Sequence, residues 1–474
     1  MKRPLRAAAL AALLFSLPAL ALAASADAPA LDGRKLGLLW ALPFAGILLS
    51  IAIMPLVVPS FWHHHFGKVA AAWAALVLVP MAVLFGVPTA GYELVHLALA
   101  DYIPFIILLL ALFTVTGGIH IKGNLHGSPS MNTAILAIGT VLAGWMGTTG
   151  ASMLLIRPII RANDDRKHKI HVFVFFIFLV SNVGGALTPL GDPPLFLGFL
   201  KGVSFFWTTQ HLFSEMVVCA IFLLGVFYAL DSYWYAKEGH LPRDPTPDSP
   251  IRIEGGVNIV LLMAIVAVVL MSGTWKPGVS ITLFHVTVEL QNIVRDVLLL
   301  GICALSMRLT PRKVRTDNAY SWAPMAEVAK LFAGIFITIA PVLAILRVGR
   351  DGALAPLVAL VTGPDGQPID VWYFWLSGIL SSFLDNAPTY LVFFNLAGGD
   401  PQLLMGTMAS TLAAISCGAV FMGANTYIGN APNFMVKAVV EDAGIRMPSF
   451  FGYMVWSGIF LIPLFVLLTF LFFV

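Results

Sequence analysis

Asp385, Asn386 and Thr389 lie close together in a segment that is otherwise largely apolar. A carboxylate, an amide oxygen and a hydroxyl are ligands that suit a hard cation, and the carboxylate can bind a proton instead. Asp385 also stands where its side chain could cap a following helix. These residues predict a site for Na⁺ or H⁺, with Asp385 as its leading member.

Further oxygen-bearing side chains occur in three other apolar segments. Small hydroxyl and amide side chains can bind an ion, but they also join transmembrane helices through hydrogen bonds, and an Asp can act as a helix cap. Glycine contributes chiefly by permitting a break in the backbone. The remaining candidates for the Na⁺, H⁺ or substrate site are Thr148, Thr149 and Ser152; Asn182, Gly184, Thr188 and Asp192; and Asn425, Thr426 and Asn430.

Two of these segments repeat one another. Residues 185–196 align without gaps on residues 423–434, with identical residues at six of twelve positions and an offset of 238. The alignment pairs Asp192 with Asn430, so the two copies differ in charge. The polar stretches 148–152 and 385–389 align at nearly the same offset, 237. The sequence therefore predicts two related halves with chemically unequal sites.

The elements that must position these residues are membrane helices. Hydrophobic residues make up 59% of the 474 residues and charged residues only 11%, and apolar stretches of about 17–25 residues, enough to cross a bilayer, recur along the chain. The sequence predicts an all-α polytopic membrane protein. The expected spans are 36–58, 69–87, 102–118, 212–232, 256–273, 292–307, 328–346 and 449–472.

Four other apolar regions are interrupted by polar residues, glycine or proline. Regions 131–162 and 371–397 predict re-entrant helical hairpins, and regions 171–200 and 403–436 predict broken helices. Unpaired backbone groups cost several kcal/mol each in hydrocarbon, so such breaks persist where protein, water or an ion satisfies them. Broken helices at matching positions are typical of secondary transporters with a site near the bilayer midplane.

The distribution of basic residues sets the expected orientation. With the N-terminus outside, the loops assigned to the cytoplasm hold 15 basic residues and the opposite loops six. This path inverts one half relative to the other. We expect a signal peptide at 1–23, a first repeat at 24–236, a cytoplasmic linker at 237–255 and a second repeat at 256–474. The expected location is the bacterial inner membrane, with a periplasmic mature N-terminus.

Several other polar residues have two possible roles. His63, His64 and His65 could bind a metal, but an interfacial loop is the favoured interpretation. Arg157 could donate to a carboxylated substrate or extend toward the cytoplasmic surface, which we favour. Glu93, His96 and Asp101 are expected in a solvated periplasmic connection.

Three motifs carry a family resemblance. Residues 181–194, 382–389 and 423–432 resemble the ion transporter superfamily, which groups citrate transporters, arsenite pumps and D-type Na⁺/H⁺ antiporters. The resemblance implies a scaffold domain that mediates a homodimer and a transport domain, formed by both hairpins and both broken helices, that moves like an elevator. Gly147–Gly150 departs from the acidic tip common in the antiporters, and the dicarboxylate pattern Ser-Asn-Thr is absent from both tips.

The predicted function is secondary active Na⁺/H⁺ antiport. The alternative is cation-coupled transport of citrate or another carboxylate, received by hairpin amides and Arg157. The chain has no phosphate-binding loop of the Gly-Lys-Ser/Thr type and no hydrolase motif, so we expect ion gradients to supply the energy and no enzymatic activity. No cofactor is expected beyond the transported Na⁺ and H⁺. The expected partners are small ions or a carboxylate, the lipid bilayer and a second copy of the chain. Nucleic acid is not expected to bind.

Overall fold

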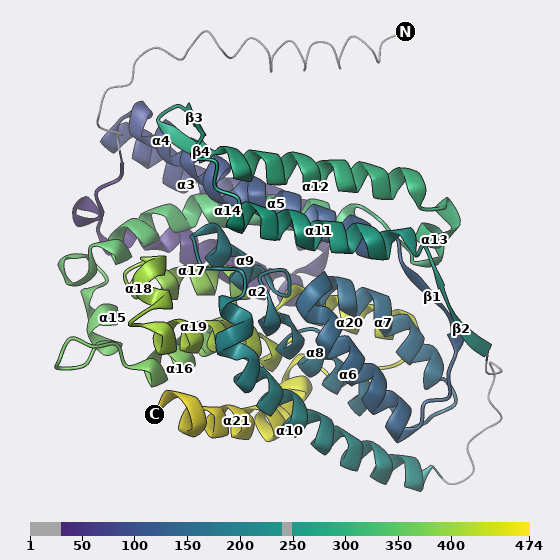
Figure 1. The fold of residues 1–474 in the computed structure, drawn as a ribbon. Helices are drawn as coiled ribbons and strands as arrows, with labels where there is room; N and C mark the ends of the chain where they lie inside the picture. The colour runs from purple at the N-terminus through teal and green to yellow at the C-terminus, as the bar shows by residue number, and fades with distance from the viewer. Residues whose placement is uncertain (1–29, 239–248) are drawn as a thin grey trace, which may run out of the picture.

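The computed structural model describes residues 30–238 and 249–474 (Figure 1). The expected signal peptide at 1–23 and much of the expected linker lie outside these residues. Within the described residues, nine helices are long and apolar enough to cross a membrane. They include all eight expected spans, and the ninth, Ile170–Leu187, belongs to the first expected broken helix. The chain is a mostly helical, multi-pass membrane protein.

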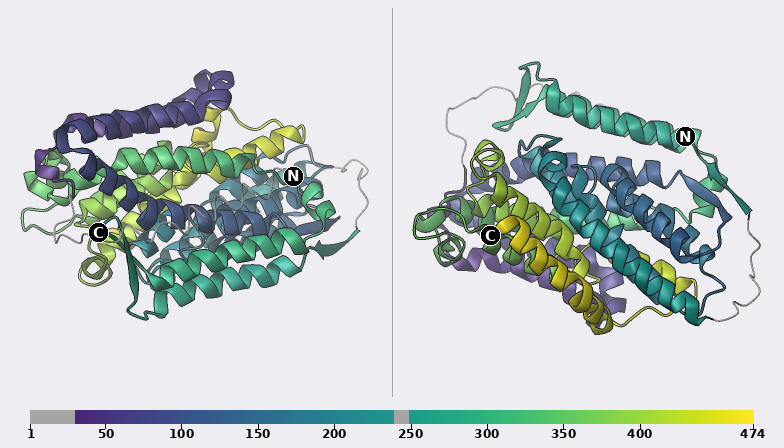
Figure 2. Two further views of the ribbon diagram at one scale, coloured as in Figure 1. Left: turned by 90° about the horizontal axis from the view of Figure 1, so that it is seen from above. Right: turned by 60° about the horizontal axis from the view of Figure 1, so that its bottom comes forward.

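One set of helices, here called the first group, holds most of the long uninterrupted spans. In Figure 2, α2 and α3 lie at one edge of the molecule and the pair α11 and α12 at the opposite edge, with α14 and α5 between them. Many side chains of these helices are apolar and exposed, as is typical of helix faces that contact lipid. The first group consists of α2 (Leu42–Val57), α3 (Pro59–Phe85), α4 (Val87–Leu97), α5 (Ile103–Thr116), α11 (Val257–Thr274), α12 (Leu290–Leu309) and α14 (Ala323–Arg347).

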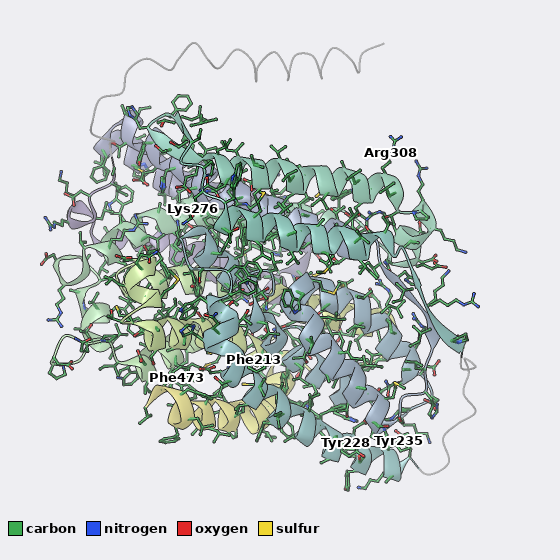
Figure 3. All side chains as sticks on the ribbon, viewed as in Figure 1. Phe213, Tyr228, Tyr235, Lys276, Arg308 and Phe473 are labelled. Atoms are coloured by element: carbon green, nitrogen blue, oxygen red, sulfur yellow. The ribbon has the colours of Figure 1, made fainter. Side chains whose placement is uncertain are left out.

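The second group contains both helical hairpins and both interrupted helices. Its two halves interlock, since α17 packs against α9, and α20 packs against α7. Phe213 and Tyr228 extend outward from α10 (Figure 3) and are exposed. The second group consists of α6 (Pro129–Met146), α7 (Thr148–Ala162), α8 (Ile170–Leu179), α9 (Pro193–Leu200), α10 (Trp207–Lys237), α16 (Asp370–Phe383), α17 (Asn386–Leu396), α19 (Ala409–Phe421), α20 (Ala431–Asp442) and α21 (Phe450–Leu468).

The two interrupted helices have matching backbones. A short 3₁₀ segment follows the first half of each, at Val183–Leu187 and at Met422–Asn425. The next turn is extended at Thr188 (φ −141°, ψ 163°) and at Thr426 (φ −139°, ψ 167°). The sequence similarity between these segments is therefore accompanied by the same local conformation.

Two small antiparallel sheets were not expected from the sequence. Strand β1 (His120–Asn124) pairs with β2 (Ser249–Glu254), and β3 (Ser280–Leu283) pairs with β4 (Val286–Glu289). Strand β2 lies inside the expected linker, and its Glu254 bonds Lys122 Nζ at 2.8 Å. This hydrogen bond raises the pKa of the partly exposed Lys122 amine. The linker therefore includes an ordered strand beside the first hairpin.

The boundaries and surroundings of several segments differ from expectation. Helix α3 begins at Pro59 and contains His63–His65, so these histidines are helical and do not lie on a loop. Glu93 and His96 lie on α4, and Asp101 is buried and bonds Lys201 Nζ at 2.5 Å. The prediction of a solvated connection is wrong for Asp101, which is buried, and all three residues belong to the helical stretch Val87–Thr116, in which Glu93 and His96 are partly exposed.

The second interrupted helix begins at Ala409 and ends at Asp442, later than the expected 403–436. Residues Pro401–Met405 form a separate short helix, because Asp400 caps it and Gly406 ends it. The other short helices are α13 (Arg312–Asp317) and α15 (Ala355–Leu360), with 3₁₀ turns at Gly33–Lys35, Leu38–Ala41 and Gly349–Asp351 and π-helical turns at Ala98–Tyr102 and Thr469–Phe473.

Candidate ion-binding site

The first hairpin turns at Gly147, between α6 and α7. Gly147 has φ +84° and ψ 145°, a conformation that is essentially restricted to glycine. In the second hairpin, Asp385 takes the corresponding place directly before α17. Gly147 and Asp385 are 238 residues apart, which is the same offset as between the two interrupted helices. The sequence alignment of 148–152 with 385–389 gave an offset of 237, one residue less.

Asp385 caps its own helix. Its Oδ1 accepts a hydrogen bond from the backbone N–H of Ala387 at 3.0 Å, and Thr389 Oγ1 donates to the Asp385 carbonyl oxygen at 3.0 Å. The side chain is half-buried. Asp385 therefore has the capping role that the sequence left open beside ion binding.

Asp192 is the carboxylate on which the two halves converge. Its Oδ1 accepts from Thr148 Oγ1 at 3.0 Å and from Asn430 Nδ2 at 3.3 Å, and its Oδ2 accepts from Asn386 Nδ2. Asp192 is only 1% exposed, and it makes no side-chain capping bond although it directly precedes α9. Both hairpin tips and the second interrupted helix thus contact one buried carboxylate through neutral donors.

Two equivalent threonines, one in each half, join each helix break to the hairpin of the same half by hydrogen bonds. Thr188 Oγ1 donates to the Gly144 carbonyl at 2.5 Å and accepts from Leu190 N at 3.1 Å. Thr426 Oγ1 makes the same bonds to the Ser382 carbonyl at 2.5 Å and from Ile428 N at 3.2 Å. These bonds satisfy carbonyl groups in the last turns of α6 and α16 and N–H groups within the two breaks, and they give Thr188 and Thr426 a positioning role.

Amide side chains connect the two breaks to each other. Asn182 Nδ2 donates to Asn433 Oδ1 at 2.7 Å, and Asn430 Nδ2 lies 3.2 Å from Asn182 Oδ1. Ser152 bonds Ser181 at 2.8 Å. The sequence had placed Asn433 in the repeated motif, but Ser181 was not singled out as a site residue although it directly precedes Asn182.

Two buried amide oxygens lack a hydrogen-bond donor among the described residues: Asn386 Oδ1 and Asn425 Oδ1. The Asn386 amide donates to Asp192, and the Asn425 amide donates to Ser382 Oγ at 2.9 Å. A buried acceptor without a donor is costly, and a cation would satisfy it. The carboxylate, amide and hydroxyl oxygens near Asp192 form a ligand set that suits Na⁺.

Within the described residues, the remaining candidates make no hydrogen bond to the Asp192 carboxylate. No hydrogen bond in the described part of the chain joins Thr149, Thr389 or Asn425 to its carboxylate. Gly184 lies so close to the Thr140 carbonyl that a side chain would collide with it, so its role is close packing.

A cleft between the two groups leads to Asp192. Its walls include Thr148, Thr149 and Asp192 on one side and apolar residues of α5 and α14 on the other. An adjoining pocket shares Thr149 and Gly150 with this cleft and extends to Arg157. Arg157 is half-buried and lines this pocket.

Comparisons with known proteins agree with a transport role for this architecture. A family model described as “Putative citrate transport” matches residues 33–473. Relatives include uncharacterized transporters of Mycobacterium bovis and Mycobacterium tuberculosis, each 24% identical over 324 residues that cover 67% of this chain and 71% of the relative. A 46 kDa membrane protein of Mycobacterium leprae is 24% identical over 334 residues, with the same coverage.

Proposed function

Because the chain belongs to the family described as putative citrate transport and is therefore a transporter, we propose that it exchanges Na⁺ for H⁺ across the bacterial inner membrane. The observation that carries this proposal is the environment of Asp192. Its buried carboxylate receives hydrogen bonds from Thr148, Asn386 and Asn430, all of them neutral.

A buried carboxylate without a basic partner needs another source of charge compensation. A proton neutralises it directly, whereas Na⁺ compensates its charge and also binds the free oxygen of Asn386. Since both ions need the same carboxylate, they compete for it. Competition for one site that faces each side of the membrane in turn couples the two gradients.

The larger-scale proposal keeps the architecture expected from the sequence. The second group acts as the transport domain, and its halves are inverted repeats with re-entrant hairpins. The first group acts as the scaffold and mediates a homodimer. The bias of basic residues and the repeated breaks support this arrangement with a periplasmic N-terminus.

The test uses purified full-length protein in liposomes that contain a pH-sensitive dye. We expect external Na⁺ alone to drive proton movement, and we expect Asp192→Asn to abolish it while the variant still inserts and purifies normally. Full Na⁺-driven exchange by a well-folded Asp192→Asn protein would disprove the assignment of this residue.

A second candidate is cation-coupled transport of citrate or another carboxylate. The specific observation that favours it is the description of the family, which matches nearly the whole chain. In the liposome assay, a response that requires citrate in addition to Na⁺ would replace the antiport proposal with this one.

A further inference from the structure

A groove runs along the surface of the first group, between α3 and α14. Its walls are formed by residues 64–78 of α3 and residues 330–337 of α14. The groove has a volume of about 720 Å³. Helix α3 lies at one edge of the molecule (Figure 2), so a ligand can reach the groove from the surroundings of the protein.

The groove is separate from the Asp192 cleft. Val328 of α14 lines that cleft, whereas Lys330 lines the groove. Two positions along an α-helix correspond to about 200° of rotation, so the two cavities lie on opposite sides of α14. Binding in the groove therefore does not involve the proposed ion site.

The two helices run in the same direction along the groove. A Cβ placed on Gly67 would lie 3.2 Å from Lys330 Cδ, and one placed on Gly334 would lie 3.0 Å from Ala70 Cβ. Later positions of α3 thus face later positions of α14. The side chains of both walls therefore change together from one end of the groove to the other.

One end of the groove is basic. Lys68, Lys330 and His64 line it, and the Lys330 ammonium lies 5.3 Å from the centre of the Phe66 ring. None of the described residues that line the groove is acidic. Glu327 precedes Lys330 by one turn of α14 but interacts with His63. The lysines that form ion pairs in the described chain are Lys35, Lys122, Lys201 and Lys437.

The rest of the groove is apolar. Small side chains leave room between the two helices for an alkyl chain, and the walls offer it no polar side chain beyond the basic end. A ligand that fills the whole groove therefore has an anionic head and a hydrocarbon tail. The small and aliphatic residues beyond the lysines include Ala71, Ala74, Ala75, Leu78, Ala333 and Ile337.

The depth of the lysines suits the head group of a lipid. Lys68 and Lys330 follow the first residues of their helices, Pro59 and Ala323, by about 10–14 Å of helix rise. A lysine at this depth extends its ammonium toward the membrane surface while its stem covers apolar groups. The expected orientation places these helix starts on the cytoplasmic side.

We infer that this groove binds one anionic phospholipid of the inner leaflet, with the phosphate at Lys68 and Lys330 and an acyl chain along the alanines. Basic pockets between transmembrane helices on the cytoplasmic side suit such head groups. The inference goes beyond the proposed antiport, because the site lies on the first group and uses no residue that bonds Asp192.

The test is thermal unfolding of the full chain in a nonionic detergent after bound lipid has been removed. Dioleoylphosphatidylglycerol, which is anionic, is compared with dioleoylphosphatidylcholine, which has the same acyl chains and no net charge. A ligand that binds only the folded protein raises its melting temperature, so we expect the anionic lipid to raise it more. Equal stabilisation by the two lipids would overturn the inference.

The variant Lys68→Gln/Lys330→Gln tests the head-group contacts. Its matched control is Arg308→Gln/Lys313→Gln, which removes two positive charges from exposed residues outside the groove, on the same expected side of the membrane. We expect the phosphatidylglycerol concentration for half-maximal stabilisation to rise about tenfold or more in the first variant and to stay unchanged in the control. The same rise in both variants, or in neither, contradicts the site.

The variant Ala75→Phe tests the acyl-chain contacts, because it places a ring inside the groove. Ala72 is also exposed on α3 but does not line the groove, so Ala72→Phe is the control. We expect only Ala75→Phe to lose the stabilisation by phosphatidylglycerol. Light scattering on the lipid-free protein tests for a second copy of the chain in the groove. If Ala75→Phe alone converts a dimer into a monomer, the groove is an interface between copies and the lipid inference is wrong.

Discussion

Asp192 and Asp385 are both aspartates that directly precede a half-helix, yet their hydrogen bonds differ. Asp385 bonds the N–H of Ala387 in its own helix, whereas Asp192 bonds side chains from three other segments. The capping bond gives Asp385 a role in stabilising the start of α17, and this role explains the aspartate without ion binding. Asp192 has no such bond, and this difference is the reason why we propose Asp192 and not Asp385 as the ion-binding carboxylate.

Substitutions of Asp385 separate capping from ion binding. Asparagine can still cap α17, so we expect Asp385→Asn to leave stability nearly unchanged and Na⁺-driven exchange largely intact. Alanine cannot cap, and we expect Asp385→Ala to cost about 0.5–2 kcal/mol of stability. Unfolding curves and the liposome assay measure the two effects. Loss of exchange in a stable Asp385→Asn protein would show that the Asp385 carboxylate takes part in ion binding.

Thr148 tests the donors around Asp192. Thr148→Val removes the hydroxyl that bonds Asp192 at 3.0 Å, while Thr148→Ser keeps it. A hydrogen bond to a charged group contributes about 1.5–3 kcal/mol, so we expect the Na⁺ concentration for half-maximal exchange to rise about tenfold or more in Thr148→Val. Thr148→Ser is the control, and equal behaviour of both variants would mean that this hydroxyl does not support ion binding.

At the scale of elements, the hairpin tips and the helix breaks depend on a few backbone positions. Gly147 allows α6 to end and α7 to begin without an intervening loop. Thr188 and Thr426 then tie each break to the hairpin of its own half. The site is therefore assembled from short segments whose conformations are individually constrained.

Gly147→Ala should test the first of these constraints. A side chain at φ +84° and ψ 145° costs about 1–3 kcal/mol, so we expect a lower melting temperature. Gly225 in α10 is a matched control, because a methyl group there meets open space and alanine favours the helix. If Gly147→Ala melts no lower than Gly225→Ala, the tip has a different conformation in the membrane.

At the scale of the whole molecule, a few polar contacts join the two groups. Lys201, which directly follows α9 of the second group, donates to Asp101 in the π-helical turn between α4 and α5 of the first group. Arg347 Nε of α14 donates to Asn395 Oδ1 of α17 at 3.0 Å. Contacts of this kind must break if the second group slides past the first. They are therefore suitable places to test the elevator-like proposal.

Cross-linking across this boundary should stop transport. We expect a bifunctional thiol reagent to inhibit exchange in an Arg347→Cys/Asn395→Cys variant, with recovery when the link is cleaved. A Ser50→Cys/Trp73→Cys link joins α2 to α3 within the first group, where Trp73 bonds Ser50 at 3.1 Å, and should be harmless. The native Cys219, Cys303 and Cys417 are buried, which limits background labelling. Undiminished exchange with a complete cross-link between α14 and α17 would argue against sliding.

The sequence alone determined the membrane spans and the positions of the breaks. Both are local properties, because an apolar stretch long enough to cross the bilayer is continuous in the chain. A break in such a stretch is also confined to a few residues, such as Gly147 in the first hairpin or the repeated motif that begins at Gly185 in the first interrupted helix. The same local reasoning missed strand β2, because a strand forms only with a partner strand that can lie far away in the chain. It also placed His63–His65 on a loop, because the point at which a long helix begins depends on residues well beyond the adjacent ones.

Only the tertiary structure decided which aspartate lies at the meeting point of the halves. The donors to Asp192 come from residues that are 44, 194 and 238 positions away in the chain. No local pattern contains such distances, so the sequence could identify Thr148, Asn386 and Asn430 as candidates without revealing that they share one carboxylate. Asp385 looked stronger because its polar neighbours are adjacent in sequence, whereas those of Asp192 become neighbours only when the two halves pack together.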